Sequence, residues 1–180
     1  MTGFTLWFTG LSGSGKTTIA DLVAAELTLR GRMVEKLDGD VVRTHLSYGL
    51  GFSKEDRDAN VERIGWVASR LTRAGAAVIV SAISPYAEAR LKARAFVEPF
   101  GPFVEIHVAT PLEECERRDV KGLYAKARAG EIPEFTGVSD PYEEPEHAEL
   151  RLDTTQLAPD ESVRVILGKL EELGCIGVPA

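Results

Sequence analysis

Apolar positions follow two alternating patterns along the chain. Short runs that are almost wholly apolar, as in buried strands, alternate with longer segments in which apolar residues return every three or four positions, as in helices. The nearly continuous apolar run at 76–81 is of the first kind, and further short segments predict strands over residues 5–9, 33–37, 103–108 and 149–152. Strands that alternate with helices favour a parallel sheet covered by helices. The sequence therefore predicts an α/β fold with a five-stranded parallel sheet, as a single domain over residues 1–180.

The helical periodicity predicts four longer helices and one short one. They cover residues 17–29, 54–74, 86–96 and 160–173, and the short helix runs from Pro111 to Asp119. Ser53 and Pro85 lie at predicted helix starts, and Gly31 and Gly174 at predicted helix ends. The residues expected to face the core are Ile19, Leu22, Val23 and Leu27 in the first helix, Val61, Ile64, Ala68 and Leu71 in the second, and Val163, Ile166, Leu167, Leu170 and Leu173 in the last.

The loop between the first strand and the first helix carries a phosphate-binding sequence. Residues 10–17, Gly-Leu-Ser-Gly-Ser-Gly-Lys-Thr, fit the P-loop pattern G-x-x-x-x-G-K-[ST]. Lys16 would reach the β- and γ-phosphates of a nucleotide, and the Thr17 hydroxyl would hold Mg²⁺. A glycine-rich turn without a ligand would not explain strand, loop, Gly-Lys-Thr and helix in this order. The predicted nucleotide-binding residues are Gly10, Leu11, Ser12, Gly13, Ser14, Gly15, Lys16, Thr17 and Thr18.

Polar residues follow the second predicted strand. In an open parallel sheet, ligands bind beyond the carboxyl ends of the strands, so Asp38 and Asp40 are expected near the P-loop. A polar turn with a helix cap would also account for them. On the helix that follows, Arg57 and Asn60 are three residues apart. Such a pair is ordinarily part of a solvated helix face.

Residues 121–145 break both patterns. This stretch contains the basic residues Lys121, Lys126 and Arg128, several glycines and prolines, and one aromatic, Phe135. A stretch of this length with little apolar periodicity is typical of a functional lid or a disordered linker. Basic residues beside a P-loop suit phosphate chemistry, so we expect a lid.

Composition excludes several classes of protein. The formal net charge of −7 argues against general nucleic-acid binding, although a small anionic substrate is compatible with it. Cys115 and Cys175 form no metal-ligand pattern, and we expect one half-buried thiol and one thiol in the tail. We see no signal peptide and no apolar run long enough to span a bilayer, so we expect a cytoplasmic protein without a membrane partner.

A P-loop by itself indicates only a nucleoside triphosphate. The Asn-Lys-x-Asp sequence with which GTPases recognise guanine does not occur in the chain. Motor ATPases are usually larger and carry an Asp-Glu pair at a strand end. A compact chain with acids after the second strand and a basic lid favours a phosphotransferase that acts on a small molecule. Such an enzyme needs a lid, because water would otherwise accept the phosphoryl group.

Longer motifs resemble one family, the adenylyl-sulfate kinases. The motifs are Gly-Leu-Ser-Gly-Ser-Gly-Lys-Thr-Thr (10–18), Leu-Asp-Gly-Asp-x-x-Arg (37–43), Leu-Gly-Phe-Ser-x-x-Asp-Arg-x-x-Asn (50–60), Ile-Ser-Pro-Tyr (83–86), Cys-Glu-x-Arg-Asp-x-Lys-Gly-Leu-Tyr (115–124), Phe-Thr-Gly (135–137) and Asp-Pro-Tyr-Glu-x-Pro (140–145). The resemblance implies a P-loop kinase fold and, with Mg²⁺, transfer of the γ-phosphate of ATP to the 3′-hydroxyl of adenosine 5′-phosphosulfate. The product would be 3′-phosphoadenosine 5′-phosphosulfate, made for sulfate assimilation. The resemblance also implies a homodimer, and it raises the possibility of an association with ATP sulfurylase.

The resemblance assigns a role to several side chains. Residues that match Phe52 and Phe135 sandwich the adenine of the substrate in this family, and neither phenylalanine fits a core stripe of the sequence. Asp40 is expected to act as base or orienter of the 3′-hydroxyl, and Asp38 to hold a magnesium-bound water, although these two roles could be exchanged. Ser84 is either a phosphoserine intermediate or a ligand of the substrate. The implied substrate-binding residues are Asp40, Arg43, Phe52, Arg57, Asn60, Ile83, Ser84, Lys121 and Phe135, and the implied catalytic residues are Lys16, Asp40 and Ser84.

Two other functions compete with this interpretation. A kinase for gluconate or shikimate would share the P-loop, but a sugar or small acid needs no aromatic clamp of the kind that Phe52 and Phe135 suggest. A degenerate kinase domain attached to ATP sulfurylase would act as a regulatory module. The chain keeps the P-loop and acceptor-site residues of an active kinase, so its sequence does not indicate degeneracy; these residues are Lys16, Thr17, Asp38, Asp40 and Arg57.

Overall fold

The computed structural model describes residues 2–177, so residues 1 and 178–180 of the predicted domain lie outside the described residues. Its centre is a parallel sheet with the strand order β2-β3-β1-β4-β5. The strands are β1 (Phe4–Thr9), β2 (Val34–Asp38), β3 (Ala77–Ser81), β4 (Phe103–Val108) and β5 (Leu150–Leu152). The predicted α/β fold and all five predicted strands are confirmed, with boundaries that shift by one residue at most.

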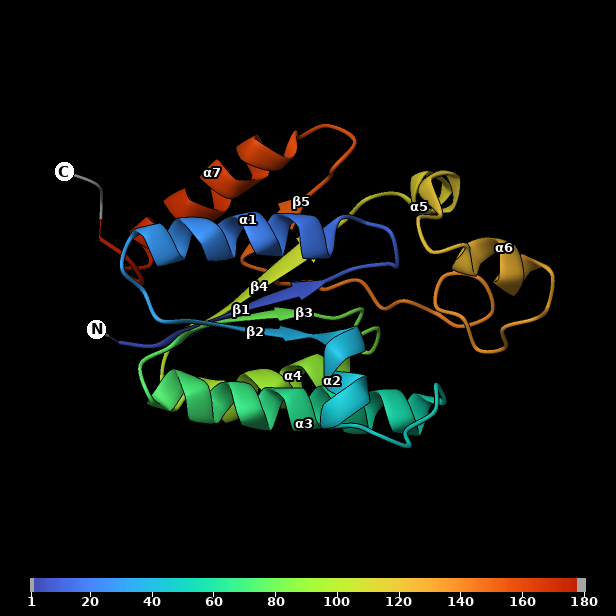
Figure 1. The fold of residues 1–180 in the computed structure, drawn as a ribbon, viewed down its shortest axis with the longest axis horizontal. Coiled ribbons are helices and arrows are strands. Elements are labelled where there is room, and N and C mark those ends of the chain that lie inside the picture. Colours follow the sequence, from blue (N-terminus) through green and yellow to red (C-terminus); the bar gives the residue numbers. More distant parts are fainter. Residues whose placement is uncertain (1, 178–180) are drawn as a thin grey trace.

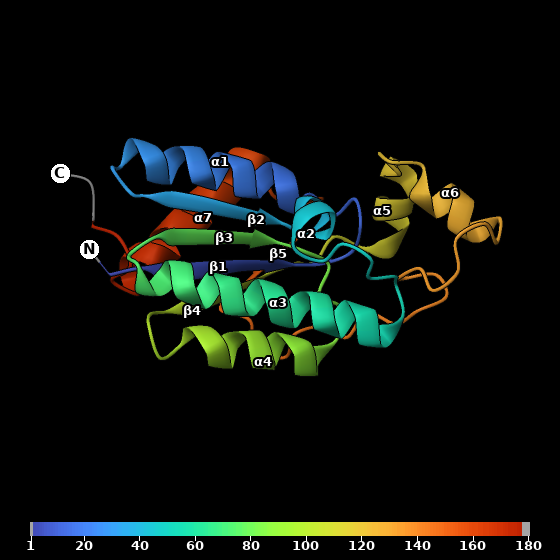
Figure 2. The same cartoon turned by 60° about the horizontal axis from the view of Figure 1, so that its bottom comes forward.

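Helices cover both faces of the sheet. The helices are α1 (Lys16–Leu29), α2 (Gly39–His45), α3 (Lys54–Arg73), α4 (Ala87–Val97), α5 (Leu112–Arg118), α6 (Leu123–Arg128) and α7 (Pro159–Glu172). Helices α1 and α7 lie on one face and α3 and α4 on the other, while α5 and α6 lie beyond the carboxyl ends of the strands (Figures 1 and 2). None of the helices in residues 2–177 is long and apolar enough to cross a membrane.

The alternation of side chains along β1 divides the core into two layers. Phe4, Leu6 and Phe8 point to the face covered by α1 and α7, whereas Trp7 points to the face covered by α3 and α4. All four side chains have no exposed surface. Both faces of the strand are buried, and β1 (Phe-Thr-Leu-Trp-Phe-Thr) is accordingly mostly apolar, with Thr5 and Thr9 as its buried polar residues.

Two short helices were not predicted. Helix α2 follows β2 directly, where the sequence suggests only a turn and a cap, and α6 lies inside the predicted lid. Helix α6 begins where the Asp119 carboxylate accepts hydrogen bonds from the backbone N–H groups of Tyr124 and Ala125, at 3.0 Å each. Helices of six or seven residues complete too few turns to show an apolar period, so local capping rather than periodicity determines them.

Some predicted positions differ in their burial. Leu22 and Leu173 were expected in the core but are 36% and 42% exposed, since each lies at the edge of its helix's apolar stripe. Both cysteines are buried, contrary to the expected half-buried and tail thiols. Cys115 packs at the base of the lid, and Cys175 packs in the core layer beneath α1 and α7.

The contact between α3 and α4 is close enough to require glycine. A Cβ atom at Gly65 would come within 2.7 Å of the Cα and Cβ atoms of Ala93. Overpacking of this kind costs about 1–3 kcal/mol, against a gain of at most about 1 kcal/mol in helix propensity. We expect Gly65→Ala to lower the free energy of unfolding, measured by chemical denaturation, by about 1–2 kcal/mol.

Gly168 in α7 provides the matched control. A Cβ atom there meets nothing within 4 Å in the described part of the chain. Gly168→Ala should therefore raise the free energy of unfolding by roughly 0.5–1 kcal/mol through helix propensity alone. Stabilisation by both substitutions would contradict the close packing at Gly65.

Candidate active site

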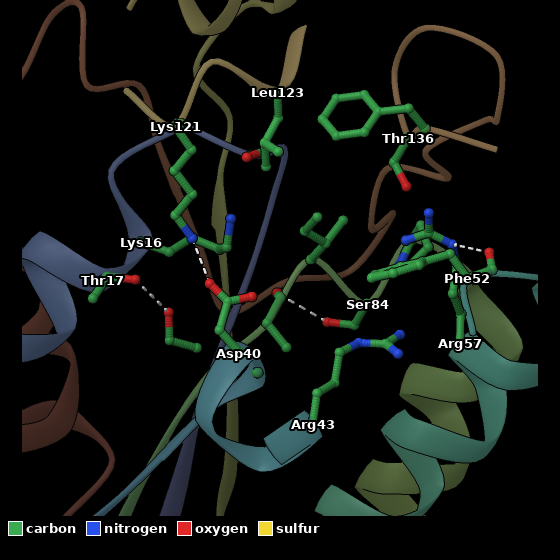
Figure 3. Close-up of a pocket in the computed structure, with 18 of the residues that line it drawn as sticks. Lys16, Thr17, Asp40, Arg43, Phe52, Arg57, Ser84, Lys121, Leu123 and Thr136 are labelled. Carbon is green, nitrogen blue, oxygen red and sulfur yellow. Dashed lines mark hydrogen bonds and ion pairs between the residues drawn. The ribbon is translucent and has the colours of Figure 1, made fainter. Parts of the chain in front are cut away.

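One pocket of about 540 Å³ lies at the carboxyl edge of the sheet. Segments far apart in sequence line it: the P-loop, the turn after β2, the first turns of α3, the loop after β3, and the lid. Figure 3 shows Lys16, Asp40, Arg57 and Lys121 directed toward the same space. The parallel sheet therefore assembles the predicted site in the place where such sheets bind ligands.

The backbone of the P-loop depends on glycine at two positions in particular. Gly10 has a φ of 149°, and a Cβ atom there would lie 2.5 Å from the carbonyl oxygen of Val108. Gly15 has a φ of 104° and is the N-cap residue of α1. No side chain among the described residues caps this helix, so its first N–H groups are available to an anion.

Lys16 is folded onto the P-loop. Its Nζ atom donates hydrogen bonds to the carbonyl oxygens of Gly10 and Leu11, at 2.9 and 2.7 Å. Burial, as the largest cause, lowers the pKa of Lys16 to about 8. An ammonium group held in this surrounding is poorly hydrated, so it can interact strongly with phosphate oxygens that approach it.

Thr17 and Asp38 bring hydroxyl and carboxylate oxygens together at the start of α1. The Thr17 hydroxyl donates to Asp38 Oδ2 at 3.4 Å and lies 3.4 Å from the Ser81 hydroxyl. Asp38 also caps α2, because its Oδ1 accepts from the backbone N–H of Asp40 at 3.0 Å. The two interpretations of Asp38, as a cap and as a site residue, are thus compatible. The described residues contain no cluster of three or more His, Cys, Asp or Glu that could hold a metal ion by themselves.

Asp40 and Lys121 join the two sides of the pocket. Lys121 Nζ forms an ion pair with Asp40 Oδ2, and both side chains are more than half exposed (Figure 3). An ion pair this exposed contributes little to stability. Its importance lies in its position, because it connects the start of α2 to Lys121, the first residue of the lid.

Two arginines lie against the Phe52 ring. The guanidinium carbons of Arg43 and Arg57 are 4.4 and 5.5 Å from the ring centroid. Arg57 also donates to the carbonyl oxygens of Phe52 and Glu134, at 2.8 and 2.5 Å. Arg57 and Asn60 are 7% and 6% exposed, so they do not form a solvated helix face. Phe52 itself is 54% exposed, which leaves ring surface available for a ligand.

Phe135 combines packing with a place in the pocket. It is 8% exposed and meets the Tyr124 ring edge-on, with the ring centroids 5.1 Å apart. Together with Cys115 and Ala127 it forms a small apolar cluster at the base of the lid. The expectation that Phe135 belongs to no core stripe was correct for the strands and long helices, but it missed this separate cluster. The Tyr124 hydroxyl donates to the Ser12 carbonyl oxygen at 2.8 Å, which joins the cluster to the P-loop.

Ser84 lies in a buried and strained turn after β3. Its φ is +43°, a conformation that is uncommon for residues other than glycine, and it is 3% exposed. The Ser84 hydroxyl accepts from Trp7 Nε1 at 3.0 Å and donates to the Ala82 carbonyl oxygen at 3.2 Å. Its neighbour Ile83 also lines the pocket, and the Ile83 carbonyl oxygen accepts from the Thr9 hydroxyl at 2.6 Å.

The structure brings together nearly all the predicted site residues. The predicted site residues that line the pocket are Ser12, Gly13, Gly15, Lys16, Thr17, Thr18, Asp38, Asp40, Arg43, Phe52, Arg57, Asn60, Ile83, Ser84, Lys121 and Phe135. The other predicted residues of the P-loop, Gly10, Leu11 and Ser14, do not line the pocket. The Ser14 carbonyl oxygen accepts from the hydroxyls of Thr110 and Thr154.

Sequence reasoning missed several residues of the pocket. Ser81 and Thr136 offer hydroxyls, and Val120, Leu123 and Ile132 contribute apolar surface. Ser81 could have been found as the last residue of β3, and Thr136 from its place beside Phe135. The apolar residues of the lid follow no periodic pattern, so the sequence does not distinguish them from residues of a disordered linker.

Comparison with known proteins gives consistent matches. A family model for adenylylsulphate kinase matches residues 2–153. The adenylyl-sulfate kinase of Picosynechococcus sp. is 58% identical over 174 residues, which cover 97% of each chain. The Mycobacterium tuberculosis APS kinase CysC, solved in complex with AMPPNP and APS, matches with a TM-score of 0.91 and 47% identity over 94% of this chain and 98% of that chain. A hexameric APS kinase from Thiobacillus denitrificans matches with a TM-score of 0.76 and 44% identity, over 99% of this chain and 30% of that longer chain.

The lowered pKa of Lys16 predicts how nucleotide binding depends on pH. Phosphate oxygens bind the ammonium form, and the pKa of free Lys16 is about 8. Affinity for a non-hydrolysable ATP analogue should vary little just below pH 8. Above pH 8 it should fall by up to about tenfold per pH unit, until pH reaches the higher pKa that Lys16 has beside bound phosphate.

Titration of the affinity between pH 7 and pH 10 checks this expectation. Lys16→Met should bind weakly and lose the dependence above pH 8, because no ammonium group remains to deprotonate. An affinity of the unsubstituted protein that stays constant up to pH 10 would show that burial does not lower the pKa of Lys16.

Proposed function

Because the chain belongs to the adenylylsulphate kinase family, we propose that it transfers the γ-phosphate of ATP to the 3′-hydroxyl of adenosine 5′-phosphosulfate. The products are ADP and 3′-phosphoadenosine 5′-phosphosulfate. One observation carries the proposal: a single pocket joins a complete P-loop to Phe52, Phe135 and two arginines. The P-loop suits the triphosphate, and the aromatic and basic half of the pocket suits a nucleotide that carries a phosphosulfate.

The two ends of the acceptor match different side chains. Phe52 and Phe135 offer aromatic surface to adenine, and stacking of a base on an aromatic ring contributes about 1–3 kcal/mol in nucleic-acid sites. Arg43 and Arg57 present guanidinium groups, which pair with phosphate and sulfate oxygens through two parallel hydrogen bonds. Asn60 and Ile83 complete this half of the site.

On the nucleotide side, Thr17 and Asp38 fit a magnesium ion that arrives with ATP. Their oxygens lie 3.4 Å apart, and Mg²⁺ usually takes one or two protein ligands together with substrate phosphates and waters. We propose that Thr17 ligates the ion directly and Asp38 through a water. When bound, Mg²⁺ neutralises charge on the β- and γ-phosphates.

We assign catalysis to groups that orient and neutralise rather than to a covalent intermediate. Lys16 stabilises charge on the transferring phosphoryl group, and Asp40 orients the 3′-hydroxyl and accepts its proton. Lys121 lies beside Asp40, where its ammonium group can neutralise charge on the phosphoryl group during the transfer. The Ser84 hydroxyl is buried and already hydrogen-bonded to Trp7 and Ala82, so we propose that Ser84 belongs to the substrate site and is not phosphorylated.

The setting of the enzyme is a further part of the proposal. We propose that it acts in the cytoplasm in sulfate assimilation, since ATP is supplied there, and that it forms a homodimer. Support for the dimer comes from the family resemblance, whereas the Thiobacillus denitrificans relative is a hexamer. Association with ATP sulfurylase remains a prediction from the resemblance.

Release of ADP from ATP and Mg²⁺ tests the reaction directly. Adenosine 5′-phosphosulfate should stimulate it strongly, and gluconate and shikimate should not. The product should carry the new phosphate on the 3′-oxygen, which phosphorus NMR identifies. Bound ATP without stimulation by adenosine 5′-phosphosulfate would favour a regulatory module, and stimulation by gluconate or shikimate would indicate another kinase.

Matched substitutions separate the roles of the two aspartates. Asp40→Asn should lower kcat on the order of 10²-fold with little change in the KM for ATP, because a general base contributes about 10²–10⁴-fold. Asp38→Asn should instead raise the concentration of Mg²⁺ needed for half-maximal rate. The opposite pattern in steady-state kinetics would exchange the two assignments.

A further inference from the structure

Ser84 keeps an unfavourable backbone conformation beside the proposed substrate site. A left-handed φ in a residue other than glycine persists only where its surroundings hold it. Trp7 binds the Ser84 side chain, and the Thr9 hydroxyl lies 3.4 Å from the Ser84 carbonyl oxygen. The shortest hydrogen bond to that oxygen comes from another element, helix α4.

Arg90 on α4 makes that bond and joins three separate segments. It is 3% exposed. Its Nη1 donates to the Ser84 carbonyl oxygen at 2.7 Å, and its Nη2 donates to the Glu143 carbonyl oxygen at 2.7 Å. Its Nε pairs with Glu105 Oε1 of β4 at 2.9 Å. One rigid guanidinium group therefore connects the sheet, the turn after β3 and the end of the lid.

The end of the lid is attached to the same turn by further hydrogen bonds. The Glu143 N–H donates to the Pro85 carbonyl oxygen at 2.8 Å, and the Glu143 carboxylate accepts from the Ala87 N–H at 2.7 Å. The Tyr142 and Thr9 hydroxyls are 2.8 Å apart. Burial raises the pKa of Tyr142 to about 12, so the Tyr142 hydroxyl stays protonated well above neutral pH.

We propose that Arg90 is a positioning residue for the acceptor substrate. By binding the carbonyl oxygens of Ser84 and Glu143 together, it holds Ile83 and Ser84 in the pocket wall and fixes the last part of the lid against them. This inference rests on the proposed function, since the acceptor is adenosine 5′-phosphosulfate. Arg90 itself touches neither the P-loop nor Lys16 among the described contacts, so its effect should be confined to the acceptor.

Arg94 offers a matched control one helical turn away. It pairs with Glu149 at 2.9 Å and with Glu105 at 3.7 Å, so it belongs to the same network of charges. Within residues 2–177 its hydrogen bonds do not reach Ser84 or the end of the lid. If the network only stabilised the fold, substitution of either arginine would have the same effect on the KM for the acceptor. If Arg90 positions the acceptor site, only its substitution should raise that KM.

Steady-state kinetics of Arg90→Lys and Arg94→Lys test the proposal. Lysine keeps a positive charge beside Glu105, but its single ammonium nitrogen cannot replace the three separate nitrogens with which the planar guanidinium reaches Ser84, Glu143 and Glu105. Arg90→Lys should raise the KM for adenosine 5′-phosphosulfate about tenfold or more and lower kcat, while the KM for ATP changes less than about twofold. Arg94→Lys should lower the melting temperature similarly and leave both KM values near those of the unsubstituted protein.

A second variant covers the case in which Arg90→Lys fails to fold. Glu105→Gln removes the buried charge but leaves Arg90 free to bind Ser84 and Glu143, so it should lower stability with an unchanged KM for adenosine 5′-phosphosulfate. A raised KM in Glu105→Gln or in Arg94→Lys, or an unchanged KM in Arg90→Lys, would overturn the positioning role. An unsubstituted protein that shows no turnover with adenosine 5′-phosphosulfate would overturn the proposed function itself.

Discussion

Parallel pairing of β1 with β3 and β4 is the constraint on which the rest of the structure depends. It aligns the carboxyl ends of the strands, so that the P-loop after β1, the aspartates near the end of β2 and the turn after β3 open toward one pocket. The P-loop uses glycines at positive φ and the turn after β3 holds Ser84 at a φ of +43°, and two buried core layers hold the strands that carry these loops. Packing energy in the core thereby maintains loop conformations that would not persist in an isolated peptide.

Buried charge follows from the same arrangement. Lys16 lies against the carbonyl oxygens of its own loop, and Arg57 and Arg90 lie against carbonyl oxygens of other loops. Each of these cations donates hydrogen bonds to carbonyl oxygens of loops that lie outside the strands. Desolvation makes such a cation costly, but it also makes the cation effective toward an anionic ligand.

The sequence predicts those parts of the site that depend on local patterns. The P-loop motif is recognisable by itself, and Asp38 and Asp40 lie at the end of the second strand and just after it, so the topology of α/β sheets brings them together. Burial of Arg57 could not be predicted in this way, because the carbonyl oxygen that binds it belongs to Glu134, 77 residues away along the chain. Helix α6 was missed because six residues are too few to show a period. The cluster around Phe135 and the network around Arg90 likewise join segments whose contacts no local pattern records.

Attachment of the lid at both ends affects the entropy of ligand binding. The Tyr124 hydroxyl joins the start of the lid to Ser12, and Tyr142 and Glu143 join its end to Thr9 and Pro85. Residues 125–141 lie between these anchors, and Arg57 holds the carbonyl oxygen of Glu134 among them. Ordering a free backbone costs about 1–2 kcal/mol per residue, so a lid that is already fixed at both ends retains more of the interaction energy as affinity. Such a lid can close by a small displacement of its middle, without the folding of a long disordered segment.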